Sequence, residues 1–284
     1  MKTGLVLEGG GMRGIYTAGV LDVFLEAGIQ FDGVIGVSAG AVHGCSFVSG
    51  QRGRSIRYYK KYCRHPRFMS WRNLLRTGDI VDEEFCYHLL PDTLDPYDYD
   101  AFNTSRTEFY VVCSNVETGR PEYLRITDMK TQVDFMRASA SLPVVSRIVH
   151  ADGKKLLDGG CTDSIPLTAF MRMGFGRNVV VLTRESGYVK KPEMQWLSRL
   201  YYRKYPKFLR ALNLRPRTYN RSLYRIARLE KQGRVFAIRP SRPLTIDRMS
   251  HSLKELEETY ALGRKDAKDR MAELKQYLLQ INRC

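Results

Sequence analysis

Residues 4–40 read GLVLEGGGMRGIYTAGVLDVFLEAGIQFDGVIGVSAG, and this stretch decides the fold class. A short apolar run at residues 4–7 leads into three consecutive glycines. Apolar residues then recur at helical spacing from Gly14, and Gly28 follows where a C-terminal cap glycine is expected. A second apolar run at 34–37 precedes a helix of small residues. Strand, glycine loop, helix and strand in this order predict a parallel βαβ unit.

The remainder of the chain continues the alternation of strands and helices. Further strands are predicted at residues 108–113, 122–126, 145–150, 155–157 and 178–182, and helices at 132–141 and 167–173. This pattern implies an α/β domain with a mostly parallel sheet covered on both faces. Basic, aromatic-rich helices begin near residue 186, followed by a strand at 234–238 and a charged helix at 253–281. We therefore expect an α/β domain at 1–185 and a basic, mainly helical extension at 186–284, packed on it or continuous with it.

Composition narrows the class of protein. The 284 residues are 43% hydrophobic and 27% charged, a balance typical of a globular chain. No apolar run approaches the roughly 18 residues of a membrane span, and the N-terminus lacks a signal-peptide pattern. We expect a cytoplasmic protein. The six cysteines show no C-x-x-C pair and the five histidines no ligand spacing, so no metal is expected.

The net charge of +16 is concentrated in two segments. Residues 51–76 hold nine Lys/Arg and no acid, and residues 186–234 hold fourteen Lys/Arg and two acids. Charge gathered in this way acts at a surface. Six apolar residues of the second segment can share one helical face, flanked by basic residues: Trp196, Leu197, Leu200, Tyr201, Phe208 and Leu212. Two readings stay open: this face packs on the core, or it lies on an anionic membrane. Nucleic-acid binding is disfavoured because no recognition motif accompanies the charge.

The pentapeptide Gly36-Val37-Ser38-Ala39-Gly40 matches G-x-S-x-G between a strand and a helix, the context of a nucleophile elbow. The turn is so tight that the positions two before and two after the serine cannot carry side chains. Ser38 Oγ then projects above the sheet, where the helix N-terminus favours developing negative charge. We therefore take Ser38 as the candidate nucleophile.

The loop Gly9-Gly10-Gly11-Met12-Arg13-Gly14 leaves backbone N–H groups uncovered, as an oxyanion hole requires, and Ala39 can add another N–H. The same loop also fits G-x-G-x-x-G, the dinucleotide fingerprint. That alternative needs an acidic residue at the tip of the second strand. Ser38 occupies this tip and Asp32 precedes the strand, so no dinucleotide cofactor is expected.

A serine nucleophile needs a base, and the histidines offer no supporting motif. His43 lies one turn into the elbow helix. The sequence Lys155-Leu156-Leu157-Asp158-Gly159-Gly160 instead places a carboxylate at a strand end, beside two glycines that allow close backbone approach. Asp158 is the better candidate, and a histidine-based triad remains the alternative.

In this order, the loop 9–14, the elbow 36–40 and the Asp158-Gly159-Gly160 turn resemble the signature blocks of bacterial patatin-like phospholipases. Residues 138–143 (ASASLP) and Ile165-Pro166 also resemble that family, and the similarity covers about residues 3–183. The resemblance implies a three-layer α/β/α fold and a Ser–Asp dyad without histidine or metal. By position, Ser38 is the nucleophile, Asp158 the base, and Gly10 and Gly11 donors to the oxyanion. Arg13 matches a basic position that shapes the loop or contacts an anionic head group.

The expected activity is therefore two-step hydrolysis of carboxylic esters in lipids, phospholipids or lysophospholipids, through an acyl-enzyme. The protein would be cytoplasmic, with peripheral contact to anionic membranes. Two alternatives stay open: a short-chain carboxylesterase, and a lipid- or membrane-binding module with little turnover.

Overall fold

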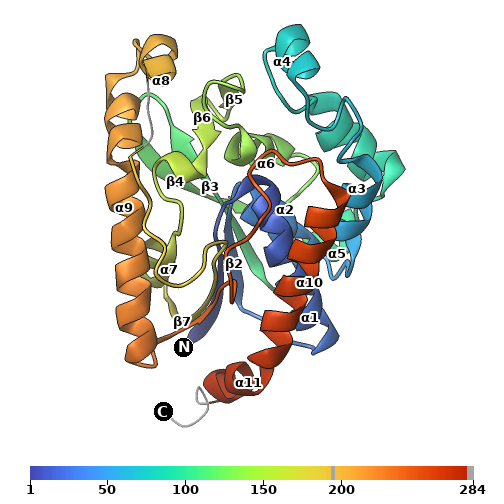
Figure 1. Ribbon diagram of the computed structural model, residues 1–284, viewed down its shortest axis with the longest axis vertical. Helices are drawn as coiled ribbons and strands as arrows, with labels where there is room; N and C mark the ends of the chain where they lie inside the picture. The colour runs from blue at the N-terminus through green and yellow to red at the C-terminus, as the bar shows by residue number, and fades with distance from the viewer. Residues whose placement is uncertain (193–195, 280–284) are drawn as a thin grey trace.

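One sheet of eight strands forms the centre of the computed structural model, which describes residues 1–192 and 196–279 (Figure 1). The strand order is β5-β6-β3-β2-β1-β7-β8, and β4 also pairs with β3. The strands are β1 (Lys2–Leu7), β2 (Gly33–Val37), β3 (Glu108–Asn115), β4 (Arg120–Ile126), β5 (Val149–Ala151), β6 (Lys154–Asp158), β7 (Phe175–Val181) and β8 (Val235–Ile238). Strands β3, β2, β1, β7 and β8 run parallel, whereas β4, β5 and β6 pair antiparallel. The mostly parallel sheet predicted from the sequence is confirmed.

Helices fill the connections between the strands. They are α1 (Ile15–Glu26), α2 (Ala39–Val48), α3 (Arg54–Tyr62), α4 (Trp71–Thr77), α5 (Tyr99–Asn103), α6 (Val133–Ala140), α7 (Leu167–Arg172), α8 (Trp196–Tyr201), α9 (Pro206–Lys231), α10 (Leu253–Asp269) and α11 (Met271–Leu279). Two 3₁₀ turns, η1 (Gly11–Gly14) and η3 (Gly159–Cys161), and a π-helix, η2 (Phe85–Leu94), complete the described part.

The two faces of the sheet carry different helices because side chains alternate along a strand. On β1, Leu5 and Leu7 belong to a core cluster shared with α1, α2, α10 and α11, whereas Val6 belongs to a cluster shared with α7 and α9. Figure 1 shows the same division, with α9 and α7 on one side of the sheet and α1, α2 and α10 on the other. The expected three-layer α/β/α architecture is therefore confirmed.

Two predicted elements differ from the structure. The strand expected at 145–150 is reduced to β5, because the backbone of Val145 and Arg147 pairs with residues 79–80 instead of with the sheet: Ile80 N donates to Val145 O (2.8 Å) and Arg147 N to Asp79 Oδ1 (2.7 Å). The helix expected at 253–281 breaks at Arg270. The break turns α11 towards the sheet, where Tyr277 OH donates to Asn178 O and Arg234 O. Residues 280–281 lie outside the described residues.

The single amphipathic face predicted across residues 196–212 is wrong. The helix ends at Tyr201, and a new helix starts at Pro206, a residue well suited to the first helical position. Phe208 and Leu212 are buried in the core, whereas Trp196 and Leu200 are each 60% exposed. Packing on the core, the first reading left open by the sequence, therefore holds for Phe208 and Leu212. Contact of the exposed residues with a membrane stays a prediction.

The C-terminal residues are built into the same sheet and layers. Strand β8 pairs with β7, and α10 packs on α1 so closely that a Cβ at Gly263 would lie 2.1 Å from Tyr16 O. Tyr260 OH also donates to Asp22 Oδ2 on α1 (2.6 Å). The division at residue 185 stays a prediction.

Candidate active site

Ser38 lies in a strained turn between β2 and α2. Its backbone adopts φ 53° and ψ −124°, a positive φ that a non-glycine residue rarely takes. The carbonyl of Ser38 already accepts the first helical bonds, from Ala41 N (2.9 Å) and Val42 N (3.1 Å). Strand and helix therefore meet at one residue, whose side chain stands at the N-terminus of α2.

The glycines that flank Ser38 are required by backbone contacts. A Cβ at Gly36 would lie 2.5 Å from Ala41 Cα, and a Cβ at Gly40 would lie 2.5 Å from Leu7 O and 2.7 Å from Glu8 O. Backbone atoms cannot rotate away as side-chain ends can. The spacing of the G-x-S-x-G motif thus follows from the close approach of α2 to its own strand and to β1.

The glycine loop abuts this elbow. A Cβ at Gly9 would lie 3.1 Å from Ser38 Cβ, and a Cβ at Gly14 would lie 2.5 Å from Ala39 Cβ. Within the described residues, the N–H groups of Gly10 and Gly11 donate no hydrogen bond, and the N–H of Ala39 belongs to the first turn of α2, which has no intrahelical acceptor. Three backbone donors therefore stand beside Ser38 without a partner in their own secondary structure.

Strand register brings Asp158 level with Ser38. Val37, the last residue of β2, pairs with Val112 of β3, and the next β3 residue, Cys113, pairs with Asp158, the last residue of β6. The two strand ends are thus separated by one intervening strand, about 10 Å at ordinary strand spacing. Both side chains line one small cavity above the sheet, together with Gly160 and the glycine loop. The glycine after Asp158 lets this turn approach β3, because a Cβ at Gly159 would lie 2.1 Å from Val112 O.

The Asp158 carboxyl is buried, with 3% of its surface exposed. Oδ1 accepts a hydrogen bond from Gly160 N (2.7 Å), whereas Oδ2 has no partner at ordinary hydrogen-bond geometry among the described residues. Burial raises the pKa of Asp158, and the nearby Ser38 hydroxyl, Arg215, the Gly160 N–H and Arg248 act in the opposite direction. The unpaired oxygen and the raised pKa together make this carboxylate a better proton acceptor than an exposed aspartate.

Ser139, a residue with no role predicted from the sequence, holds the elbow in place. Its Oγ accepts a hydrogen bond from Ser38 N (2.9 Å) and donates one to Val112 O (2.7 Å), so α6 ties the turn at Ser38 to β3. Ser139 is fully buried. Its position in the ASASLP block was the available signal, but only the fold shows which backbone groups it joins.

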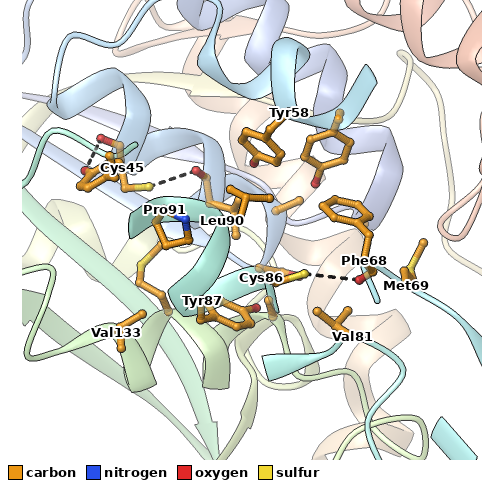
Figure 2. A pocket seen from close by; sticks show the side chains of 18 of the residues that line it. Cys45, Tyr58, Phe68, Met69, Val81, Cys86, Tyr87, Leu90, Pro91 and Val133 are labelled. Atoms are coloured by element: carbon orange, nitrogen blue, oxygen red, sulfur yellow. Dashed lines mark hydrogen bonds between the residues drawn. The ribbon is translucent and has the colours of Figure 1, made fainter. Parts of the chain in front are cut away.

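Two cavities meet at Ser38. The larger, of about 180 Å³, is apolar and reaches from Ser38 between α2, α3, η2 and α6. Figure 2 shows its lining, with the rings of Tyr58 and Phe68 on one side and Tyr87 and Val133 on the other. The smaller is the polar cavity that contains Asp158. Gly11, Ser38, Leu142 and Arg248 border both, so a molecule at Ser38 can extend into both spaces.

Residues from the C-terminal part complete the polar cavity. The sequence did not predict that these residues contribute to the site. The guanidinium of Arg215, on α9, lies 3.4 Å from where a Cβ of Gly160 would be, and the backbone of Arg248 crosses the glycine loop and accepts a hydrogen bond from Met12 N (3.2 Å). Buried Glu8 accepts hydrogen bonds from Tyr219 OH and Thr183 N, both 2.6 Å. These contacts join α9 and the connection between β8 and α10 to the end of the sheet that carries Ser38 and Asp158.

The alternatives considered from the sequence find little support in this geometry. None of the five histidines lines either cavity. His43 is buried against Tyr59, its Nδ1 lies 2.9 Å from Ser55 Oγ, and burial lowers its pKa to about 3. Asp32, the acid that precedes the second strand and was weighed for the dinucleotide alternative, accepts hydrogen bonds from Thr3 N and Oγ1 at the opposite end of the sheet.

Residues 5–171 match the family model of patatin-like phospholipases. The chain belongs to the patatin-like phospholipase family. This membership identifies it as a lipid ester hydrolase. Residues 205–279, which include α9, α10 and α11, match a separate family described as a domain of unknown function, DUF6363.

Several proteins resemble this patatin-like chain. It is 30% identical to the uncharacterized protein YjjU of Escherichia coli, over 93% of this chain and 75% of YjjU. It is also 30% identical to lysophospholipase nte1 of Aspergillus oryzae, over 61% of this chain but only 11% of that much longer protein. Among solved structures, VipD from Legionella pneumophila aligns with 96% of this chain and 67% of its own, at 12% identity and a TM-score of 0.48.

The described residues of this patatin-like chain include neither a membrane-spanning helix nor a candidate metal site. In the described residues, no helix combines the length and apolar character needed to cross a bilayer. The same residues contain no group of three or more His, Cys, Asp or Glu side chains arranged to hold a metal ion.

Proposed function

We propose that this chain hydrolyses carboxylic ester bonds of phospholipids or lysophospholipids, with Ser38 as nucleophile and Asp158 as the only side-chain base. The observation that carries this proposal is the shared cavity, in which the unpartnered Oδ2 of buried Asp158 lies beside the strained Ser38 elbow and the glycine loop. The family membership supports the same assignment.

The first step forms an acyl-enzyme. Asp158 takes the proton of Ser38 Oγ while Oγ attacks the ester carbonyl carbon. The N–H groups of Gly10, Gly11 and Ala39 stabilise the oxyanion of the tetrahedral intermediate. As that intermediate collapses, the bond to the alcohol breaks and the leaving oxygen receives the proton from Asp158. Water then repeats the sequence with Asp158 as base, releasing the carboxylic acid and restoring the Ser38 hydroxyl.

The apolar cavity favours a lipid over a short-chain ester. Its lining includes the rings of Tyr58, Tyr59 and Phe68 and several aliphatic side chains, and it begins at the nucleophile. An acyl chain placed there would gain about 0.8 kcal/mol for each buried CH₂. A short-chain carboxylesterase would leave most of this cavity empty, so it is the second candidate.

We further propose that α8 contacts anionic membranes. Trp196, Leu200 and Tyr201 are each at least 60% exposed, and Arg199 and Arg203 accompany them. Aromatic and apolar side chains with adjacent basic residues are typical of helices that lie on a membrane surface. The cytoplasmic, bacterial setting expected from the sequence stays a prediction.

Hydrolysis of p-nitrophenyl esters of increasing chain length tests the dyad and the substrate class together. Ser38→Ala and Asp158→Asn should each lose activity by about 10⁴-fold, the scale seen when a triad member is removed. Asp152→Asn, an exposed aspartate in the turn between β5 and β6, is the matched control and should keep full activity. A rate that rises with chain length supports a lipase, and a rate that falls supports the short-chain esterase.

Two results would argue against the proposal. Loss of activity in His43→Gln, with the fold intact, would favour a histidine-based mechanism. Absence of hydrolysis by folded wild type, with detergent or vesicles supplied, would favour a lipid-binding module built on a hydrolase scaffold.

A further inference from the structure

The polar cavity beside Ser38 is strongly cationic. Two carboxyls line it, Glu8 and Asp158, against five basic side chains: Arg13, Arg184, Lys190, Arg215 and Arg248. Three of the five come from the C-terminal extension predicted from the sequence, and Arg184 lies in the loop that leads into it. The catalytic dyad itself needs no such concentration of positive charge.

Among these residues, Arg13 gives the clearest indication that the cavity binds an anion. Only 6% of its surface is exposed, and its Nε has no hydrogen-bond partner among the described residues. Burial lowers the pKa of Arg13 to about 10, and the neighbouring charges of Arg184 and Arg248 act in the same direction. Glu8 partly compensates, but its two oxygens already accept hydrogen bonds from Tyr219 and Thr183. A buried guanidinium in this setting is suited to an anion.

We infer that this cavity binds the phosphate group of a glycerophospholipid while the acyl chain occupies the apolar cavity. This inference rests on the function proposed above. Because Ser38 borders both cavities, an ester carbonyl at Ser38 would have its acyl chain on one side and its phosphate-bearing glycerol on the other. The cavity of about 40 Å³ has space for roughly three water-sized groups, comparable to the outer oxygens of a phosphate.

The chemistry of the lining favours phosphate over a neutral head group. Guanidinium groups bind phosphate oxygens through paired, charge-assisted hydrogen bonds. Arg184 and Tyr188 both line the cavity, and the guanidinium carbon of Arg184 lies 4.5 Å from the centroid of the Tyr188 ring, a cation–π contact that favours this position of the guanidinium. The C-terminal extension would thereby select phosphate-bearing esters for a dyad supplied by the α/β domain.

The test compares two esters that differ only in the phosphate: 1-palmitoyl-lysophosphatidic acid and 1-palmitoylglycerol, in neutral detergent micelles. The readout is the ratio of their kcat/KM values for palmitate release. We expect wild type to prefer the phosphate ester and Arg184→Ala to lower the ratio by about 10- to 100-fold, the value of a hydrogen bond to a charged group. Arg184→Lys should retain part of the preference.

Arg217→Ala is the matched control. Arg217 is exposed, lies two residues from Arg215 on α9 and does not line the cavity, so it reports general attraction of a basic surface to a charged micelle. The wild-type ratio should persist in this variant. A ratio that falls equally in Arg184→Ala and Arg217→Ala would overturn the inference.

A binding measurement separates this inference from the proposed function. Glycerol 3-phosphate and inorganic phosphate are titrated calorimetrically into Ser38→Ala, with and without Arg184→Ala. Glycerol 3-phosphate should bind more tightly than inorganic phosphate and lose that affinity with Arg184. Equal hydrolysis of both esters, with no glycerol 3-phosphate binding, refutes the phosphate site but leaves the esterase intact. Binding without hydrolysis of any ester refutes the proposed function instead, and equal binding of both phosphates refutes the lipid head group as occupant.

Discussion

The close approach of α2 to β1 makes Gly40→Ala a sharp test of the nucleophile elbow. A Cβ at Gly40 would lie 2.5 Å from Leu7 O and 2.7 Å from Glu8 O, and contacts below 3.0 Å essentially do not occur. Because both oxygens belong to the backbone at the end of β1, the first turn of α2 must shift by about half an ångström. Ser38 and Ala39 directly precede Gly40 and would move with it.

The clash with backbone oxygens should lower both the stability and the activity of Gly40→Ala. Overpacking of a tight interior typically costs 1–3 kcal/mol, so we expect the free energy of unfolding to fall by about that amount. Displacement of a catalytic group by about 1 Å can cost about 100-fold in rate, so a shift of half that size should lower kcat/KM by roughly 10-fold or more. Urea unfolding and hydrolysis of a p-nitrophenyl ester measure the two effects.

Gly44→Ala, one turn further along α2, is the matched control. Its Cβ would meet only side-chain ends, Leu7 Cδ1 at 2.9 Å and Phe109 Cε2 at 3.2 Å, and these can adjust. Alanine also gains about 1 kcal/mol of helix propensity over glycine, so we expect stability within about 1 kcal/mol of wild type and near-normal activity. If Gly40→Ala proves as stable and active as Gly44→Ala, backbone contact is not the reason for the glycine.

Three further predictions concern charge and surface. Asp158 must be ionised to act as base, so activity should fall as pH drops through its raised pKa. Arg215→Ala should move that acidic limb of kcat/KM to higher pH, because Arg215 lowers the pKa of Asp158, whereas an unchanged limb relative to Arg217→Ala would contradict this role. Burial lowers the pKa of His43 to about 3, so the unfolded chain binds a proton that the folded chain does not, and stability is lost as pH falls below about 6.5. Between pH 7.5 and pH 5 this loss should be about 2 kcal/mol in urea unfolding and absent from His43→Gln; equal slopes would refute it. The double variant Trp196→Ser/Leu200→Ser should sediment several-fold more weakly with phosphatidylglycerol vesicles. Tyr224→Ser, which removes an exposed aromatic residue of α9, should sediment like wild type. Equal sedimentation of wild type and both variants would exclude α8 as the membrane contact.

Helix boundaries show where local patterns stop being informative. The periodicity of residues 196–212 suggested one apolar face, but Pro206 starts a new helix and the two parts differ in burial. The apolar run at 145–150 suggested a full strand, yet its backbone pairs with residues 79–80. In the first case a new helix start interrupted the helical periodicity. In the second case hydrogen bonds to a distant segment replaced the sheet pairing that the apolar run predicted.

The sequence by itself determined the α/β class, the family and the βαβ unit at residues 4–40, because apolar periodicity and the spacing of glycines in short motifs are visible within a few positions. Gly36 illustrates this, since a Cβ there would meet Ala41 and Gly40 of its own turn, whereas the contacts of Gly40 with Leu7 O and Glu8 O exist only in the fold. Only the tertiary structure decided that Asp158 stands level with Ser38 across β3, that Ser139 anchors the elbow, and that Arg215 and Arg248 reach the site. These contacts join segments that lie far apart in the sequence, and strand register and helix packing, which no local pattern encodes, set them.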